Sequence, residues 1–126
     1  MTAGKQLSGD ELHRRQVAQN VDFSGPVIVC VGLSLPSNIG GVLRIADAMR
    51  CREVIFVDTP YQNSRRIRKV SRHMSDKLPH RFVSFAAFET MVEPLLPLVA
   101  IEITTESRNL YDTTLPADVT LVIGSE

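Results

Sequence analysis

The stretch Leu35-Pro36-Ser37-Asn38-Ile39-Gly40-Gly41-Val42-Leu43-Arg44-Ile45-Ala46-Asp47-Ala48-Met49-Arg50 decides the fold, because it separates two apolar runs at residues 27–31 and 54–57. Continuous runs rich in β-branched residues are typical of strands covered on both faces, as in a parallel sheet. The stretch between them predicts a loop that leads into a helix. Pro36 stiffens the loop, and Ser37 or Asn38 is expected to cap the first free backbone N–H groups.

The predicted helix carries one apolar stripe, whose members recur at helical spacing and are expected to face the core: Ile39, Leu43, Ala46 and Met49. Gly40 and Gly41 lie in the first turn, where each costs roughly 1 kcal/mol relative to alanine. The close approach of another backbone or of a ligand would compensate that cost. Arg44 lies roughly 140° around the helix from Ile39, so its guanidinium is off the stripe and free to act.

Strands and helices alternate along the rest of the chain. Helices are predicted at residues 67–78 and 86–95, and further strands at residues 81–85, 98–103 and 119–123. Helices between strands imply right-handed crossovers, so we expect an α/β fold with a mostly parallel sheet and helices on both faces. Residues 25–126 are expected to form this domain. Residues 1–24 are expected to form an N-terminal helical extension, in which Ser8-x-x-Glu11 resembles a capping box.

Composition indicates an ordinary soluble domain, with 44% hydrophobic and 22% charged residues and a formal net charge of zero. The charge is unevenly distributed. Residues 1–81 carry thirteen Lys/Arg and seven Asp/Glu, a net of +6, whereas residues 82–126 carry one and seven, a net of −6. This asymmetry predicts a basic face.

The cysteine and histidine positions point to no metal site. Cys30 and Cys51 match no ligand spacing, and neither do the three histidines. No disulfide is required, so a reducing cytoplasm fits the chain. The sequence has neither the apolar core of a signal peptide nor a run long enough to cross a membrane.

Other α/β enzyme classes lack their motifs here. A dinucleotide-binding fold needs G-x-G-x-x-G after the first strand, and the turn at residues 32–36 does not supply it. There is no Gly-Lys-Ser/Thr of a phosphate-binding loop. No serine lies in a Gly-x-Ser-x-Gly setting, so hydrolase chemistry has no support.

A second informative segment holds half of all lysines and arginines of the chain: Arg65, Arg66, Arg68, Lys69, Arg72, Lys77 and Arg81. Only Asp76 opposes them. The apolar positions of this segment, Ile67, Val70, Met74 and Leu78, give its helix a buried stripe, which leaves the basic side chains exposed. Binding of a phosphate backbone is the favoured interpretation, and a solvated helix face is the alternative.

The quoted stretch also carries a family resemblance. Asn38-x-Gly40-x-x-x-Arg44-x-Ala46 resembles the first motif of the SpoU (TrmH-type) RNA ribose methyltransferases of the SPOUT class. The last residues, Leu121-Val122-Ile123-Gly124-Ser125-Glu126, resemble the start of that family's second motif. The resemblance covers residues 26–126. The family continues into a third motif and a knot-forming helix, which the 126 residues do not contain, so we expect a C-terminally incomplete SPOUT-type domain.

The resemblance implies transfer of a methyl group from S-adenosylmethionine to a ribose 2′-hydroxyl of tRNA or rRNA. It assigns catalytic roles to three residues. Arg44 positions the RNA and activates the hydroxyl. Asn38 orders the loop or contacts the substrate, and Glu126 supports the site. Because arginine stays protonated, Arg44 is expected to bind the adjacent phosphate and to stabilise a developing oxyanion. The alternative for Arg44 is a surface salt bridge with Asp47 or Asp58.

The resemblance assigns further contacts as well. Gly124 matches a glycine that lets the backbone approach the cofactor, and Thr104 and Thr105 fall where the family's cofactor pocket has a wall. Ser71 resembles a serine near the RNA site, so the predicted RNA-binding residues are Arg65, Arg66, Arg68, Lys69, Ser71 and Arg72. The resemblance also implies a homodimer.

The end of the chain suggests an alternative function. Strand 119–123 is apolar, yet no helix follows to cover it, so we expect exposed apolar surface, self-association and weak or absent binding of S-adenosylmethionine. The alternative to the methyltransferase is a catalytically incomplete RNA-binding or dimerisation domain with the same fold.

Overall fold

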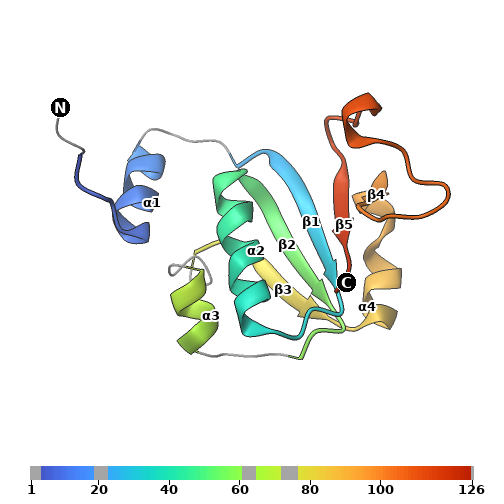
Figure 1. The fold of residues 1–126 in the computed structure, drawn as a ribbon. Helices are drawn as coiled ribbons and strands as arrows, with labels where there is room; N and C mark the ends of the chain where they lie inside the picture. Colours follow the sequence, from blue (N-terminus) through green and yellow to red (C-terminus); the bar gives the residue numbers. More distant parts are fainter. Residues whose placement is uncertain (1–3, 19–22, 61–64, 72–76, 126) are drawn as a thin grey trace.

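A five-stranded sheet with helices on both faces forms the body of the protein (Figure 1). The computed structural model describes residues 4–18, 23–60, 65–71 and 77–125. The strands are β1 (Gly25–Val31), β2 (Cys51–Val57), β3 (His80–Val83), β4 (Leu98–Ala100) and β5 (Thr120–Ile123). The helices are α1 (Gly9–Ala18), α2 (Pro36–Ala48), α3 (Arg65–Val70) and α4 (Phe85–Met91), with short 3-10 turns η2 (Glu93–Leu95) and η3 (Leu110–Asp112).

The sheet is parallel throughout, in the order β3-β2-β1-β5-β4. β1 is the central strand, and Val29 pairs with Ile55 of β2 on one side and Val122 of β5 on the other. The chain first builds the sheet outward from β1 through β2 to β3, and then crosses to the opposite side to add β4 and β5. The direction of winding therefore reverses between β1 and β5.

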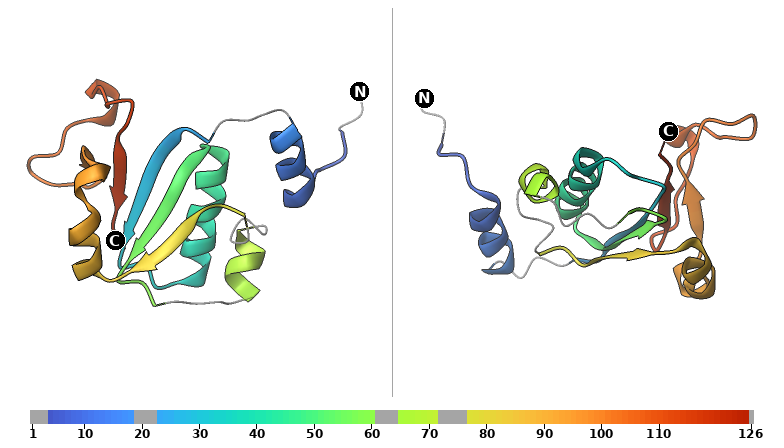
Figure 2. Two further views of the ribbon diagram at one scale, coloured as in Figure 1. Left: turned by 180° about the vertical axis from the view of Figure 1, so that it is seen from behind. Right: turned by 90° about the horizontal axis from the view of Figure 1, so that it is seen from below.

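Both faces of β1 and β2 are buried, which confirms the expectation from their continuous apolar runs. Ile28 and Cys30 belong to one core cluster together with residues of α2 and α3. Val27 and Val29 belong to a second cluster on the opposite face with Phe88 of α4. The view from below in Figure 2 shows α2 and α3 on one side of the sheet and α4 on the other. The predicted α/β layering is thus confirmed.

Gly40 allows α3 to lie directly on α2. A Cβ atom at residue 40 would lie 2.9 Å from the carbonyl oxygen of Ile67 and 2.9 Å from Cβ of Val70. A Cβ at Gly41 would meet nothing within 4 Å. The expected close approach is therefore confirmed at Gly40 and absent at Gly41.

The start of α2 differs from the prediction. The helix begins at Pro36, its N-cap is Leu35, and no side chain caps it. The predicted capping by Ser37 or Asn38 is therefore wrong. Proline at the first helical position supplies the physical reason, because it has no N–H to cap and its φ already suits a helix.

Three other predicted elements need correction. Met49 lies beyond the helix end and is 44% exposed, so it is not part of the buried stripe. The predicted helix 67–78 is observed as α3 at Arg65–Val70, and Leu78 is buried outside it, while Met74 lies outside the described residues. The strand predicted to reach residue 103 ends at Ala100.

The N-terminal helix α1 has the predicted capping box. The Ser8 N–H donates to Oε2 of Glu11 at 2.8 Å, and the Glu11 N–H donates to Oγ of Ser8 at 3.2 Å. An ion pair between Asp10 and Lys77 connects α1 to the segment that leads into β3.

Residues 101–112 form an exposed excursion between β4 and β5 (Figure 1). It carries large apolar side chains in solvent: Ile101, Ile103, Leu110 and Tyr111. Leu121 and Ile123 of β5 are only half-buried, so apolar exposure near the last strand is confirmed in part. Among the described residues, no helix has both the length and the apolar character needed to cross a membrane.

Gly40→Ala is expected to destabilise the fold by about 1–3 kcal/mol, because the added methyl group overpacks the α2–α3 contact. Gly41→Ala, in the same helical turn, is the matched control and is expected to stabilise by about 0.5–1 kcal/mol. Urea unfolding followed by circular dichroism measures both. Equal effects of the two substitutions would show that the α3 backbone does not restrict residue 40.

Candidate functional site

Arg44 is exposed on α2 and makes no hydrogen bond or ion pair with any residue that the structure describes. The alternative of a salt bridge to Asp47 or Asp58 is therefore not observed. Asp47 is 6% exposed, and Oδ1 of Asp58 instead accepts a hydrogen bond from the Phe85 N–H at 2.9 Å. The guanidinium of Arg44 is thus available to a ligand. Asn38, in the first turn of the same helix, is also exposed.

A cleft of about 390 Å³ lies at the carboxyl ends of the central strands. It is lined by the last residues of three strands and by residues that follow them: Val31, Ala100, Glu102, Val122, Ile123, Gly124 and Ser125. This position is the point where the winding reverses between β1 and β5. In open α/β sheets, ligands bind outside the carboxyl ends of the strands at such a point.

Gly124 lies beside Glu102 in this cleft. A Cβ atom at residue 124 would lie 3.1 Å from Oε1 of Glu102, so any side chain there would push the glutamate aside. The carboxylate of Glu102 and the glycine backbone therefore face one another across a small space. The arrangement can accept hydrogen bonds from hydroxyl or amino groups of a ligand.

The structure separates the predicted site residues into groups. Gly124 lines the strand-end cleft, whereas Thr104 and Thr105 do not. Thr104 is engaged within the excursion, where its N–H donates to Oγ of Ser107 at 2.8 Å. Arg44 lies eight residues after the start of α2, about 12 Å along the helix axis, and does not line the cleft either. Glu126 lies outside the described residues.

Sequence reasoning assigned no role in a site to six of the cleft residues: Val31, Ala100, Glu102, Val122, Ile123 and Ser125. Their position at or after the end of an apolar run could have indicated the site, because the carboxyl ends of parallel strands meet at one edge of the sheet. The strand order, which brings β1, β5 and β4 together, was not encoded in any single run.

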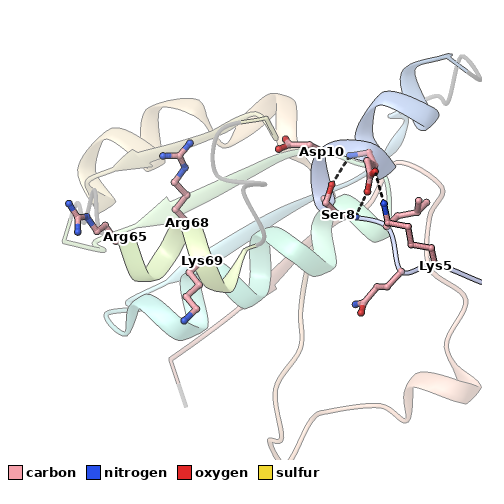
Figure 3. A pocket seen from close by; sticks show the side chains of 10 residues that line it. Lys5, Ser8, Asp10, Arg65, Arg68 and Lys69 are labelled. Carbon is pink, nitrogen blue, oxygen red and sulfur yellow. Dashed lines mark hydrogen bonds and ion pairs between the residues drawn. The ribbon is translucent and has the colours of Figure 1, made fainter.

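A second, larger cleft of about 670 Å³ separates the N-terminal segment from α3 (Figure 3). Residues 5–11 form one wall, and Arg65, Arg68 and Lys69 form the other. Arg65 and Lys69 make no hydrogen bond or ion pair with another described residue. These side chains give the cleft a basic wall that can bind an anion.

The acidic residues of the same cleft are already engaged. Asp10 pairs with Lys77, and Oε1 of Glu11 lies 3.9 Å from Nζ of Lys5. Hydrogen bonds from the backbone and side chain of Ser8 hold the pKa of the Glu11 carboxyl below its usual range. Glu11 therefore remains charged at neutral pH, where it completes the capping box.

The remaining predicted RNA contacts have different positions. Arg66 is exposed on α3 but does not line the cleft, and Arg72 lies outside the described residues. Ser71 has a fully buried side chain, whose hydroxyl donates to the carbonyl oxygen of Arg68 at 3.1 Å. This placement corrects the prediction for Ser71, because its side chain packs between α2 and α3 and does not face solvent.

The thiols are inert by burial. Burial raises the pKa of Cys30 to about 12 and that of Cys51 to about 11, so both stay protonated near neutral pH. Within the described part of the chain, no three histidine, cysteine or acidic side chains are grouped closely enough to hold a metal ion.

Comparison with known proteins agrees with this geometry. The model of the SpoU rRNA methylase family matches residues 25–126. No curated protein matches the sequence significantly.

Solved structures share the fold. An RNA 2′-O ribose methyltransferase is 29% identical, with a TM-score of 0.67 over 78% of this chain and 38% of that chain. An AdoMet-bound rRNA methyltransferase from Sinorhizobium meliloti is 16% identical, with a TM-score of 0.69 over 82% of this chain and 41% of that chain. A protein described with the 2-OH methylation of C/U34 on tRNA is 19% identical, with a TM-score of 0.64 over 80% and 68% of the two chains.

The chain therefore spans about two-fifths of the length of the first two of these structures. The family match takes in about four-fifths of the chain, and it includes both the motif on α2 and the strand-end cleft. On this evidence, the chain belongs to the SpoU rRNA methylase family.

Proposed function

We propose that the protein is a cytoplasmic RNA methyltransferase that transfers a methyl group from S-adenosylmethionine to a ribose 2′-hydroxyl of tRNA or rRNA. Membership of the SpoU family supports this proposal, and so does the likeness to an RNA 2′-O ribose methyltransferase. The observation that carries it is the exposed guanidinium of Arg44, which has no partner among the described residues and lies on the helix that follows the central strand.

The strand-end cleft suits the cofactor. Its volume of about 390 Å³ falls within the usual range for small-molecule pockets, roughly 300–1,000 Å³. S-adenosylmethionine supplies an electrophilic methyl group on a sulfonium. Gly124 lets the backbone approach the ligand, and the Glu102 carboxylate accepts hydrogen bonds from its hydroxyl or amino groups. Thr104 and Thr105 remain predicted contacts on the loop beyond Glu102.

Arg44 acts on the RNA in this proposal. A ribose 2′-hydroxyl is a poor nucleophile and must be held in line with the methyl group while it loses its proton. A guanidinium cannot take that proton, because it is already protonated. Arg44 therefore binds the neighbouring phosphate and stabilises negative charge as it develops on the oxygen. Asn38 is proposed to order the same loop, and Glu126 to support the site.

The basic residues of α3 bind the RNA backbone in this proposal. Arg65, Arg66, Arg68 and Lys69 are exposed, while Ile67 anchors the helix in the core with 5% of its surface exposed. Such a helix presents several cations of one sign to solvent, which is the footprint of phosphate binding.

We also propose a homodimer through the outer face of α2. Ile45 is 59% exposed and Met49 is 44% exposed, and they lie one turn apart on the exposed side that also carries Arg44. Apolar side chains grouped at an exposed face are typical of interaction sites.

Arg44→Ala is expected to lower methyl transfer by a factor of about 100–1,000, because the charge that stabilises the reacting oxygen is lost. Cofactor affinity and the thermal midpoint should stay close to the parent values. A tritiated-methyl assay on unmodified tRNA and rRNA measures the effect, with Arg108→Ala in the exposed excursion as the control. Unaltered turnover would remove Arg44 from the mechanism.

Simultaneous replacement of Arg65, Arg66, Arg68 and Lys69 by glutamine is expected to weaken binding to all RNA sequences. The slope of log K against log salt should become shallower by up to about 0.7 for each phosphate of a single strand that is no longer neutralised. Fluorescence anisotropy over a salt series gives this slope. An unchanged slope would identify α3 as a solvated face without a role in RNA binding.

Ile45→Glu is expected to weaken the dimer at least about tenfold, because a side chain worth about 1.5–3 kcal/mol when buried is replaced by a charge. Sedimentation velocity over a concentration series measures the association. Phe85→Glu, an exposed apolar residue on α4, is the control and should leave association unchanged. Equal effects of the two substitutions would exclude the α2 face.

A further inference from the structure

The exposed excursion begins with a compact turn at residues 102–107, just beyond the end of β4 (Figure 1). The Ser107 hydroxyl lies at the centre of this turn and donates to the carbonyl oxygen of Glu102 at 2.8 Å. Oγ of Ser107 also accepts a hydrogen bond from the Thr104 N–H at 2.8 Å and lies 3.0 Å from Oγ1 of Thr104. One hydroxyl therefore connects both ends of the turn.

The hydroxyl protons of the turn have one consistent arrangement. A serine hydroxyl has one proton to donate and two lone pairs that accept. The Ser107 proton is used by the Glu102 carbonyl, so the Thr104 hydroxyl is the donor between the two side chains. Oγ1 of Thr104 then accepts from the Glu106 N–H at 3.2 Å. Removal of the Ser107 hydroxyl would therefore break three hydrogen bonds at once.

The backbone of Glu102 is fixed on both sides by these contacts. Before it, the Ile101 N–H donates to the Val122 carbonyl oxygen of β5 at 2.9 Å. After it, the carbonyl oxygen of Glu102 itself is held by Ser107. The side chain reaches over the strand-end cleft, where Oε1 lies 3.1 Å from the place of a Cβ atom at Gly124. The turn thus sets the direction in which the carboxylate points.

Glu102 supplies the charge of the strand-end cleft. None of the other described residues in the lining is charged, and Val31, Val122 and Ile123 give the cleft apolar walls. The Glu102 carboxylate makes no hydrogen bond or ion pair with another residue that the structure describes. A unit charge beside apolar walls acts more strongly on a ligand than the same charge in bulk water. The cleft therefore favours a ligand that carries a positive charge.

We propose that Ser107 is a positioning residue that aims the Glu102 carboxylate into the cleft, and that Glu102 selects the cationic methyl donor over its neutral product. The inference rests on the proposed function, because it takes the cleft to hold S-adenosylmethionine. The sulfur of this donor is a positively charged sulfonium. When the methyl group is transferred, the sulfur keeps the electron pair of the broken bond and becomes the neutral thioether of S-adenosylhomocysteine. A carboxylate near the sulfur stabilises the donor alone, so the product leaves more readily.

Glu102→Gln tests the selection, because it removes the charge and keeps an oxygen that accepts hydrogen bonds. Binding of S-adenosylmethionine should weaken at least about fivefold, the effect of one unit charge at about 4 Å in water. Binding of S-adenosylhomocysteine should not change. Glu106→Gln removes the same charge from the same turn but not from the cleft lining, so it is the matched control and should change neither affinity.

Both affinities can be measured by titration followed by the amide resonance of Gly124 in NMR spectra, which detects binding up to the millimolar range. An equal loss for the two ligands would show that the carboxylate binds a hydroxyl or ammonium group that both of them carry. That result would overturn the selection by charge.

Ser107→Ala tests the positioning role and should reproduce the loss of preference for the donor, because the carboxylate is no longer held. Ser107→Thr keeps the hydroxyl and should restore the preference. Thr113→Val is the control, since it removes a hydroxyl that donates to the Asn109 carbonyl oxygen at 2.7 Å in the same excursion. In the Glu102→Gln background, Ser107→Ala should have no further effect on the preference, because Ser107 acts through the carboxylate.

The results separate this inference from the proposed function. If Ser107→Ala behaves like Thr113→Val, or weakens both ligands equally while lowering the thermal midpoint, the positioning role is wrong and the proposed methyltransferase stands. If Glu102→Gln changes neither affinity, the selection is wrong and the cofactor site stands. If neither ligand shifts the Gly124 resonance of the parent protein, the cleft is not a cofactor site and both proposals fail.

Discussion

The missing side chain at Gly40 is the constraint on which the functional surfaces depend. It brings the backbone of α3 into direct contact with α2, so the helix that carries the motif also positions the basic helix. Ile67 and Ser71 are buried at this contact, which directs Arg65, Arg68 and Lys69 outward to solvent and to the N-terminal cleft. Gly40 of the motif therefore allows the two helices to pack, while Arg44, four residues later, stays exposed and available to a ligand.

Strands β1 and β2 were predictable because each of them contains a single continuous run of apolar residues. The β-branched residues of β1 and β2 require cover on both faces wherever the strands lie. Element ends were less predictable. Ile101 and Ile103 continue the apolar character of β4, yet their side chains are exposed beyond the end of the strand. There, among the described residues, only the Ile101 N–H still donates to β5, to the Val122 carbonyl oxygen at 2.9 Å.

The candidate site was predictable only where a short motif carries it. Arg44 and Gly124 could be found because each lies within a local pattern, and both are placed where a ligand can reach them. Glu102 and Lys5 could not be found in this way. Glu102 acquires its neighbour Gly124 only because β5 pairs with β4, and Lys5 lines the same cleft as Arg65 although the two are 60 residues apart in the chain.

The insertion of β5 also has a consequence for synthesis on the ribosome. Ile28 of β1 pairs with Leu121 of β5, 93 positions later in the chain. At about 5–20 residues per second, the inner edge of β1 emerges about 5–20 s before its partner strand. During that time an apolar central strand has unpaired backbone groups, and such an edge can pair with another nascent chain. The order of translation thus makes β1 the segment of this fold that most needs protection by a chaperone.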